Sequence, residues 1–599
     1  SITSGGNYNT VVGDEAGTAI TTGDDNTAVG YKALDTGTGT GNTAIGSAAL
    51  DAQTTASFNT AVGSNAGAAN TTGGELVAVG RNALTANTTG AANTAVGMRA
   101  LDANTTASNN TAVGQAALTD NTTGANNTAV GYLASRVITT GSNNVSVGAG
   151  GNLGANTTGA NNVAVGYASL GGNTTASNNT AVGFDSLAAN TTGHSNVAMG
   201  LNALNDNTTA SYNTSVGAYS MDKTTTGSNN TAVGYQALEL NTTAYQNTAV
   251  GVTALKSTTT GADNTGVGFS ALFANTTGYD NTAVGKSSLV ANTTGATNTA
   301  VGSNALVANT TGGANVAIGY QALDANTTGG TNTAVGKAAM TANTTGSNNT
   351  AVGLSALNAN TTAGSQTGMG YVALYNATTG HSNTGIGSQA LYSLTTGIEN
   401  IAMGMQAGQY NTAITTGNYN TILGAYSHAS IAAAEHQIVL GYNVNSAGNN
   451  TVTIGKGHGS SDRIYNTYTS NATWTHSSDE RLKKEITSNN DCGLDFINSL
   501  RTVTYKWKAP SELDTTMYNY DANNSSVDYD KKMYGFVAQE VKAAMDTHNI
   551  TDFAGYSKLE DGIDNIEGIS YEMFVVPLMK AIQELSTQNA ALAARLTTL

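Results

Sequence analysis

One short phrase returns along most of the sequence, and its fixed spacing limits the folds that the chain can adopt. The pentapeptide Asn-Thr-Ala-Val-Gly, or a close variant, occurs 27 times with its glycine running from Gly13 to Gly455. Most successive glycines follow at a step of 17, as Gly80 and Gly97 do. Self-similarity at a constant period indicates a solenoid, in which each unit buries its apolar face only by stacking on its neighbours. We therefore expect a stack of equivalent units instead of several independent globular domains.

The composition favours an ordered repeat over a disordered chain. Only 10% of the 599 residues are charged, while 72 are glycine and two are proline. Disordered chains usually carry more charge and lack regularly spaced apolar residues. Here a leucine recurs four residues after the repeat glycine, as at Leu84, Leu101 and Leu118.

A single unit has room for short strands but not for a helical hairpin. The unit that begins at Asn93 reads NTAVGMRALDANTTASN. Its Thr-Ala-Val segment favours a strand, and its Asn-Thr-Thr segment supplies turn residues that tolerate left-handed dihedrals. We predict that each unit is one coil of a β-solenoid with two short strands and two turns. At about 4.8 Å per coil, the stack would be a rod about 130 Å long.

The alternation within the strand suggests how its two faces are used. A period of two places Thr and Val on one face and Asn, Ala and Gly on the other. We predict that Val and the downstream Leu form interior ladders. The small Ala and Gly would then face the axis of a homotrimer, where backbones approach closely.

The residues after Gly455 lack the repeat and differ from it in composition. The chain has 22 Lys and Arg and 38 Asp and Glu, and of these 60 charged residues 26 lie in residues 1–455 and 34 in the remaining 144. Both prolines, both tryptophans and the single Cys492 also lie there. We predict a mainly β shaft over 1–455, a connector over 456–477 and a small α/β domain over 478–599. Cys492 is expected to be a buried apolar residue.

The end of the chain has the pattern of a coiled coil. After Pro577, residues 578–599 place one residue at alternating steps of four and three: Leu578, Ile582, Leu585, Asn589, Leu592, Leu596 and Leu599. Such a heptad seam predicts a helix in the core of an oligomer, where Leu585 and Leu592 pack and Asn589 fixes the register. The alternative is an amphipathic helix that packs on its own domain.

The stretch THSSDERLKKEI, residues 475–486, has the strongest chemical pattern, with two interpretations. Glu480 lies three residues after Ser477, as in a helix capping box, and the charged residues then form a solvated face. A Ser and a Lys five residues apart also fit a nucleophile and its base, provided that burial lowers the pKa of the lysine.

Three stretches in the same order resemble a known family: SDERLKKEI from Ser478, YGFVAQEV from Tyr534, and YEMFVVPLMKAIQEL from Tyr571. Over about the last fifth of the chain they resemble the C-terminal intramolecular chaperone and auto-processing domain of phage tail spikes, tail fibres and endosialidases. That resemblance implies a domain that trimerises, promotes folding of the preceding fibre and then cuts itself off.

The resemblance also implies roles for individual residues. Ser478 would be the nucleophile and Lys483 its general base, with cleavage between Ser477 and Ser478. Asp479 and Arg481 match the motif and would position the loop. The enzyme activity implied is a single-turnover autoproteolysis.

Together these features predict a phage tail fibre, a homotrimeric virion appendage that binds a host-surface glycan or protein. Tyrosines that follow the repeat glycine are candidates for stacking on sugars: Tyr31, Tyr132, Tyr167, Tyr235, Tyr320 and Tyr371. A bacterial trimeric surface adhesin or filament is the alternative, because the repeats loosely resemble the head repeats of trimeric autotransporter adhesins. A polysaccharide depolymerase is a third, which requires a carboxylate pair across a sugar site.

Charge and composition argue against other partners. The net charge is −16 and no basic stripe is present, which disfavours nucleic acid. No apolar run approaches the roughly 18 residues of a membrane span, so we expect no membrane insertion. The first residues, SITSGGNYNT, lack the pattern of a signal peptide. His and Cys show no metal-ligand spacing, and we expect neither a metal nor a cofactor.

Overall fold

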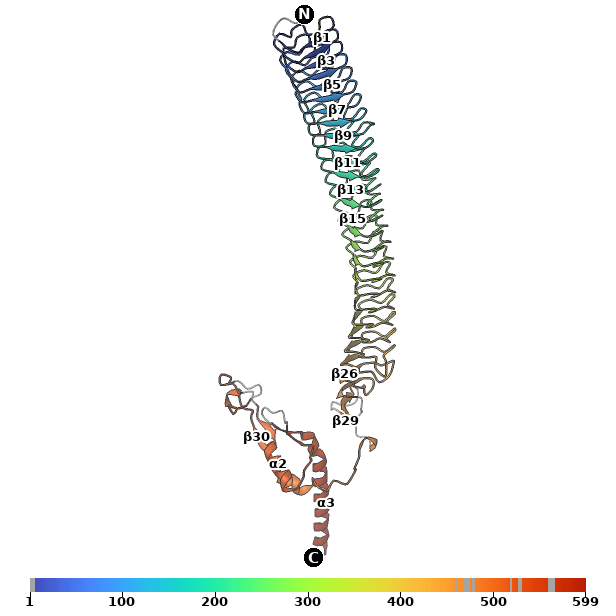
Figure 1. Ribbon diagram of the computed structural model, residues 1–599. Helices are drawn as coiled ribbons and strands as arrows, with labels where there is room; N and C mark the ends of the chain where they lie inside the picture. Colours follow the sequence, from blue (N-terminus) through green and yellow to red (C-terminus); the bar gives the residue numbers. More distant parts are fainter. Residues whose placement is uncertain are drawn as a thin grey trace. The chain divides into compact units, whose positions relative to one another are not determined.

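The computed structural model describes residues 6–457, 462–467, 475–476, 480–517, 520–525, 531–558 and 566–598. The chain forms two compact units, Ser1–Ser477 and Ser478–Leu599. Figure 1 shows the first unit as a stack of thin coils, and the second as a mixture of helices and short strands. Within the described part of the chain, no helix is both long enough and apolar enough to cross a membrane.

The first unit is a β-solenoid with one parallel strand per coil. Each residue of a strand lies opposite its equivalent one repeat later, as in the pairs Thr94 with Thr111 and Val96 with Val113. The predicted β-solenoid is therefore confirmed. The parallel strands are β1 (Thr10–Val12), β2 (Thr27–Val29), β3 (Thr43–Ile45), β4 (Thr60–Val62), β5 (Val77–Val79), β6 (Thr94–Val96), β7 (Thr111–Val113), β8 (Thr128–Val130), β9 (Val145–Val147), β10 (Val163–Val165), β11 (Thr180–Val182), β12 (Val197–Met199), β13 (Thr214–Val216), β14 (Thr231–Val233), β15 (Thr248–Val250), β16 (Thr265–Val267), β17 (Thr282–Val284), β18 (Thr299–Val301), β19 (Val316–Ile318), β20 (Thr333–Val335), β21 (Thr350–Val352), β22 (Thr367–Met369), β23 (Thr384–Ile386), β24 (Ile401–Met403), β25 (Thr421–Leu423), β26 (Gln437–Tyr442) and β27 (Thr451–Lys456).

The rest of each coil is a series of turns, not the predicted second strand. In the sixth coil, Arg99 and Leu101 have φ angles of 59° and 52°. These left-handed residues bend the chain repeatedly, yet the Leu101 N–H still donates to the Ala117 carbonyl of the next coil, at 3.0 Å. The Asn-Thr-Thr segment bends the chain as predicted, but its residues have no positive φ, and Asn104 is fully buried.

The predicted faces of the strand were reversed. Ala95 and Leu101 are fully buried inside the coil, whereas Val113 keeps 36% of its surface exposed. The interior is narrow and leucines from the turns fill it. At Gly266, which replaces the usual alanine, an added Cβ would lie 3.2 Å from Leu255 Cγ. Only a small side chain fits beside the leucine, so the larger valine points outward.

Buried asparagines join the coils through their side chains. Asn298 Nδ2 donates to Asn281 Oδ1 at 3.1 Å and to the Gly312 carbonyl at 2.9 Å. A second ladder runs beside the first, where Asn309 Nδ2 donates to Asn292 Oδ1 at 2.8 Å and to the same Gly312 carbonyl at 3.0 Å. Because buried amides need such partners, the ladders stabilise one alignment of each coil on the next.

After β27 the sheet continues with strands of opposite direction. β28 (Arg463–Thr467) pairs with β27 in an antiparallel manner, and β29 (Thr475–His476) pairs with β28 in the same way. The regular stacking of coils therefore ends at β27.

The second unit has a small core of its own. Its elements are η2 (Glu480–Leu482), α1 (Leu494–Ser499), β30 (Val503–Tyr505), η3 (Pro510–Glu512), β31 (Met533–Gly535), α2 (Ala538–Thr547), β32 (Tyr556–Lys558), β33 (Glu567–Ile569), η4 (Tyr571–Phe574) and α3 (Val575–Thr597). β30 pairs with β31, and β32 with β33, both antiparallel. Phe496, Val541 and Phe574 are buried in one cluster with Cys492, and the predicted burial of Cys492 is confirmed.

Candidate processing and assembly site

The processing motif is only partly within the described residues. Ser477, Ser478 and Asp479 lie outside them, so the assigned nucleophile and cleavage site stay predictions. Arg481 lies in η2, and Lys483 follows it with an exposed side chain. The Lys483 N–H donates to the Glu480 carbonyl at 3.1 Å. A single 3-10 turn thus holds the Arg481 backbone and presents Lys483 at the surface, so the burial that the dyad requires of this lysine is not present in the single chain.

The second motif forms the turn between β31 and α2 and packs on the third motif. The Phe536 N–H donates to the Tyr571 hydroxyl at 3.1 Å. The Phe536 ring stacks on Phe574, with 5.2 Å between ring centroids. A Cβ on Gly535 would collide with the Tyr571 hydroxyl oxygen, which explains glycine at this position. These contacts join α2 to the start of α3.

An ion pair fixes α2 to the segment before β30. Arg501 Nε lies 2.9 Å from Glu540 Oε2, and the second guanidinium nitrogen bonds the other carboxylate oxygen. Hydrogen bonding to Arg501 holds the pKa of Glu540 below its usual value. Both side chains are exposed, so the pair positions the helix more than it stabilises the unit.

A carboxylate on α3 caps the short helix α1. Glu584 Oε2 accepts a hydrogen bond from the Leu494 N–H at 2.6 Å, and Glu584 also pairs with Lys580 at 3.3 Å. The bond from Leu494 is the main reason that the pKa of Glu584 lies below its usual value. Pro577 and Ala581 are buried on the same helix. The first half of α3 therefore packs on its own unit.

The second half of α3 leaves its seam uncovered. The helix itself is confirmed over Val575–Thr597. Leu585, Leu592 and Leu596 are 46%, 54% and 65% exposed, and Asn589 is exposed with them. Leu578 and Ile582 in the first half are also 45% and 62% exposed, so α3 contacts its own unit through Pro577 and Ala581 and not through the seam. The register role of Asn589, Leu585 and Leu592 remains a prediction.

A second uncovered apolar surface runs along the solenoid. We call the side of β1–β25 formed by the first and third residues of each strand the outer strand face. Its first residue is Thr, Val or Ile, and its third is Val, Ile, Met or Leu, without one charged residue in the 25 strands. Ile45, Met199 and Ile318 are 39% to 43% exposed. An apolar stripe of this length typically marks an interaction surface.

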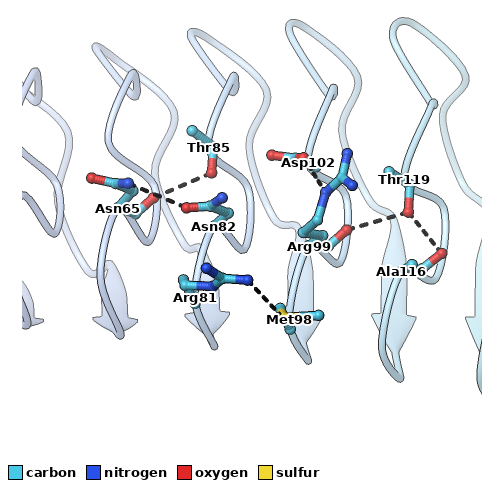
Figure 2. Close-up of polar contacts among 9 residues, drawn as sticks. All are labelled: Asn65, Arg81, Asn82, Thr85, Met98, Arg99, Asp102, Ala116 and Thr119. Carbon is cyan, nitrogen blue, oxygen red and sulfur yellow. Dashed lines mark hydrogen bonds and ion pairs between the residues drawn. The ribbon is translucent and has the colours of Figure 1, made fainter.

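The turns of the coils carry most of the polar variation. Figure 2 shows polar contacts within and between successive coils, where Arg99 Nε pairs with Asp102 at 2.9 Å and Asn65 Nδ2 donates to Asn82 Oδ1 at 3.2 Å. Among the tyrosines proposed to bind sugars, Tyr132 and Tyr167 are each 53% exposed. Tyr167 stacks on Phe184, with 5.2 Å between centroids. Their role in binding a receptor stays a prediction.

The search among curated proteins returns no match to the sequence. Comparison with protein families gives one result that bears on the second unit. Residues 478–550 match the family described as the chaperone of endosialidase. The match begins at the proposed nucleophile and extends just past the end of α2. Residues 478–550, which follow the β-solenoid, are thus similar in sequence to the chaperone of endosialidase family.

Proposed function

We propose that this chain is a homotrimeric tail fibre of a phage virion that attaches to a host cell surface. The observation that carries the proposal is the similarity of residues 478–550 to the chaperone of endosialidase family. In this chain these residues follow a long β-solenoid. The solenoid serves as the shaft, and the C-terminal domain acts as an intramolecular chaperone for it.

Two apolar surfaces support a trimer. The outer strand face and the seam of α3 are both exposed, and neither carries a charged side chain. Their polar side chains are Thr on the strand face and Asn589 in the seam. Three copies that turn these surfaces toward a common axis bury both of them, which a single chain does not achieve. A heptad seam with one Asn at a core position suits such an assembly.

The need for a chaperone follows from the repetition. Two chains of the trimer that slip by one whole repeat keep almost every contact between their shafts. A C-terminal domain without repeats can associate with its copies in one alignment only. It therefore defines the register of the three chains before their shafts associate. Removal of this domain afterwards makes unfolding harder to reverse and adds kinetic stability.

For the removal step we assign the roles that the motif implies. The Ser478 hydroxyl attacks the carbonyl carbon of Ser477 while Lys483 accepts the hydroxyl proton. The C–N bond between Ser477 and Ser478 then breaks, and the Ser478 nitrogen leaves as an amine that takes up a proton. Water hydrolyses the ester left between the Ser478 oxygen and the Ser477 carbonyl, which separates the two fragments. Asp479 and Arg481 position the loop. The reaction occurs once per chain.

Mass analysis of the purified protein tests this step. We expect the wild type to appear as two fragments that separate between Ser477 and Ser478, and both Ser478→Ala and Lys483→Ala to remain intact. An intact wild type contradicts autoproteolysis, and equal cleavage of Ser478→Ala contradicts this nucleophile. The native mass of the intact Ser478→Ala protein then gives the number of chains.

The location has its own test. Antibodies against the shaft should label phage particles and block their adsorption to host cells. Label on bacterial cells that carry no phage would instead support the trimeric surface adhesin.

A further inference from the structure

One coil of the solenoid is longer than its neighbours. The step from Gly404 to Gly424 is 20, whereas the usual step between equivalent residues is 17. Ile414 takes the core position that Asn occupies in most coils, and it is fully buried. Its N–H donates to the Gly408 carbonyl at 2.9 Å, six residues back. In an ordinary coil the equivalent bond, from Asn360 to Leu357, reaches only three residues back.

The additional residues therefore form a bulge on the surface and leave the stack undisturbed. Between this bulge and the preceding coil lies a surface pocket of about 500 Å³. Its lining residues are Gln389, Tyr392, Gln406, Gln409, Tyr410 and Asn411. Pockets that bind small ligands have volumes of this order, roughly 300 to 1,000 Å³.

The pocket walls are held in place by contacts outside the cavity. Tyr392 stacks on Tyr375 of the coil before, with 5.2 Å between centroids and 12° between ring planes. Gln409 Oε1 accepts a hydrogen bond from the Ser393 N–H at 2.9 Å. Tyr410 packs edge-on against Tyr426, at 5.1 Å. The aromatic and amide groups are thus positioned before any ligand arrives.

The chemistry of the lining selects one kind of ligand. Four of the six side chains are amides, which carry both donors and acceptors, and two are tyrosines. A sugar ring offers an apolar C–H face for an aromatic ring and hydroxyls for the amides. None of the six lining residues is charged, and an anionic sugar would need a cation such as Arg.

We propose that this pocket binds a neutral saccharide unit of a host-surface glycan. The proposal rests on the host-attachment function above and adds the place and the ligand class. It differs from the sequence-based candidates, because none of the tyrosines that follow the repeat glycine lines the pocket.

Saturation-transfer NMR on the full-length protein tests the proposal. The probes are the methyl glycosides of glucose, galactose, mannose, N-acetylglucosamine and N-acetylgalactosamine, with N-acetylneuraminic acid as the anionic comparison. We expect at least one neutral glycoside to bind, and Tyr410→Ala and Asn411→Ala to weaken its binding at least tenfold. Tyr279→Ala is the matched control, because Tyr279 is 53% exposed, does not follow a pentapeptide glycine and lies outside the pocket.

Three results would overturn the proposal: binding of no neutral glycoside, binding of the anionic sugar alone, or equal binding by wild type and both pocket variants. Thermal unfolding of each variant shows that the shaft is intact. Adsorption of the wild-type protein to host cells separates this proposal from the proposed function. Adsorption to host cells without saccharide binding would contradict only the assignment of the pocket. Saccharide binding without adsorption would contradict only the proposed host attachment.

Discussion

At the scale of the residue, the repeat glycine is required by the distance between coils. Gly319 has a φ of 134°, a region that is essentially restricted to glycine. A Cβ at this position would lie 2.6 Å from the Gly336 carbonyl oxygen of the next coil. Since the same geometry recurs in coil after coil, the pentapeptide ends in glycine for a backbone reason.

This geometry gives the first prediction. Gly319→Ala should lower the free energy of unfolding by about 1 to 3 kcal/mol from backbone strain alone. Gly313→Ala, six residues earlier, is the control because the equivalent position one repeat before it is already Ala296. Chemical denaturation of both variants checks this. Equal stability of the two variants would show that the coils separate easily to accept a side chain.

The sequence predicted which residues share a face of the strand, but not which face is inward. The alternation of residues along the strand fixes which side chains share a face. The volume available inside the coil decides which of the two faces points inward. Leucines such as Leu101 fill the interior from the turns, so an alanine such as Ala95 fits inside the coil and a valine does not. The burial of Asn93 and Asn104 was also missed. Their return once in every repeat was a visible signal, since buried amides are stabilised when they stack on copies of themselves.

At the scale of the element, local patterns predicted α3 and the solenoid, whereas distant contacts had no sequence signal. Glu584 caps α1 across 90 residues, and Arg501 pairs with Glu540 across 39. Neither pair has a characteristic spacing. The second strand of the coil was predicted wrongly, because left-handed leucines such as Leu101 are rare outside such stacks.

The cap on α1 makes the second unit sensitive to acid. The folded state lowers the pKa of Glu584 below its ordinary value of 4.5. The stabilisation is therefore present above that pH and is lost as the pH falls through the lowered pKa. We expect Glu584→Gln to be less stable than wild type at neutral pH, with the difference shrinking as the pH falls below 4.5.

Fluorescence-detected unfolding of the full chain in the Ser478→Ala background, with and without Glu584→Gln, measures this, since both tryptophans lie after the repeats. Glu572→Gln is the control, because Glu572 is an exposed carboxylate at the start of the same helical segment. A pH-independent difference between Glu584→Gln and wild type would mean that the carboxylate charge does not stabilise α1.

The uncovered seam of α3 gives the third prediction. Leu592→Asp places a charge in the proposed trimer core and should weaken assembly about tenfold or more. Ala594→Asp is the control, since Ala594 lies outside the heptad seam and is exposed. Sedimentation equilibrium in the Ser478→Ala background, where the chain stays in one piece, compares them. Equal association of both variants would place the trimer contacts elsewhere.

At the scale of the whole molecule, the shaft behaves as a one-dimensional stack. Each coil contacts only its neighbours, and the contacts repeat because the residues repeat. The order of residues within a coil fixes how the next coil sits on it. The number of coils is left open by these contacts, so the length of the shaft is independent of its stability per coil.

Deletion of whole units should therefore shorten the shaft without unfolding it. Removal of Thr282 to Asn349, which is four whole units, joins Asn281 to Thr350 in the original phase. We expect a rod shorter by about 19 Å, from about 4.8 Å per coil, as measured by electron microscopy. Removal of residues 282–341 is the control, since it joins Asn281 to Ala342 out of phase. This variant breaks both asparagine ladders at the junction and should unfold locally there. Similar folding of the two deletions would show that contacts between coils do not enforce the phase of the repeat.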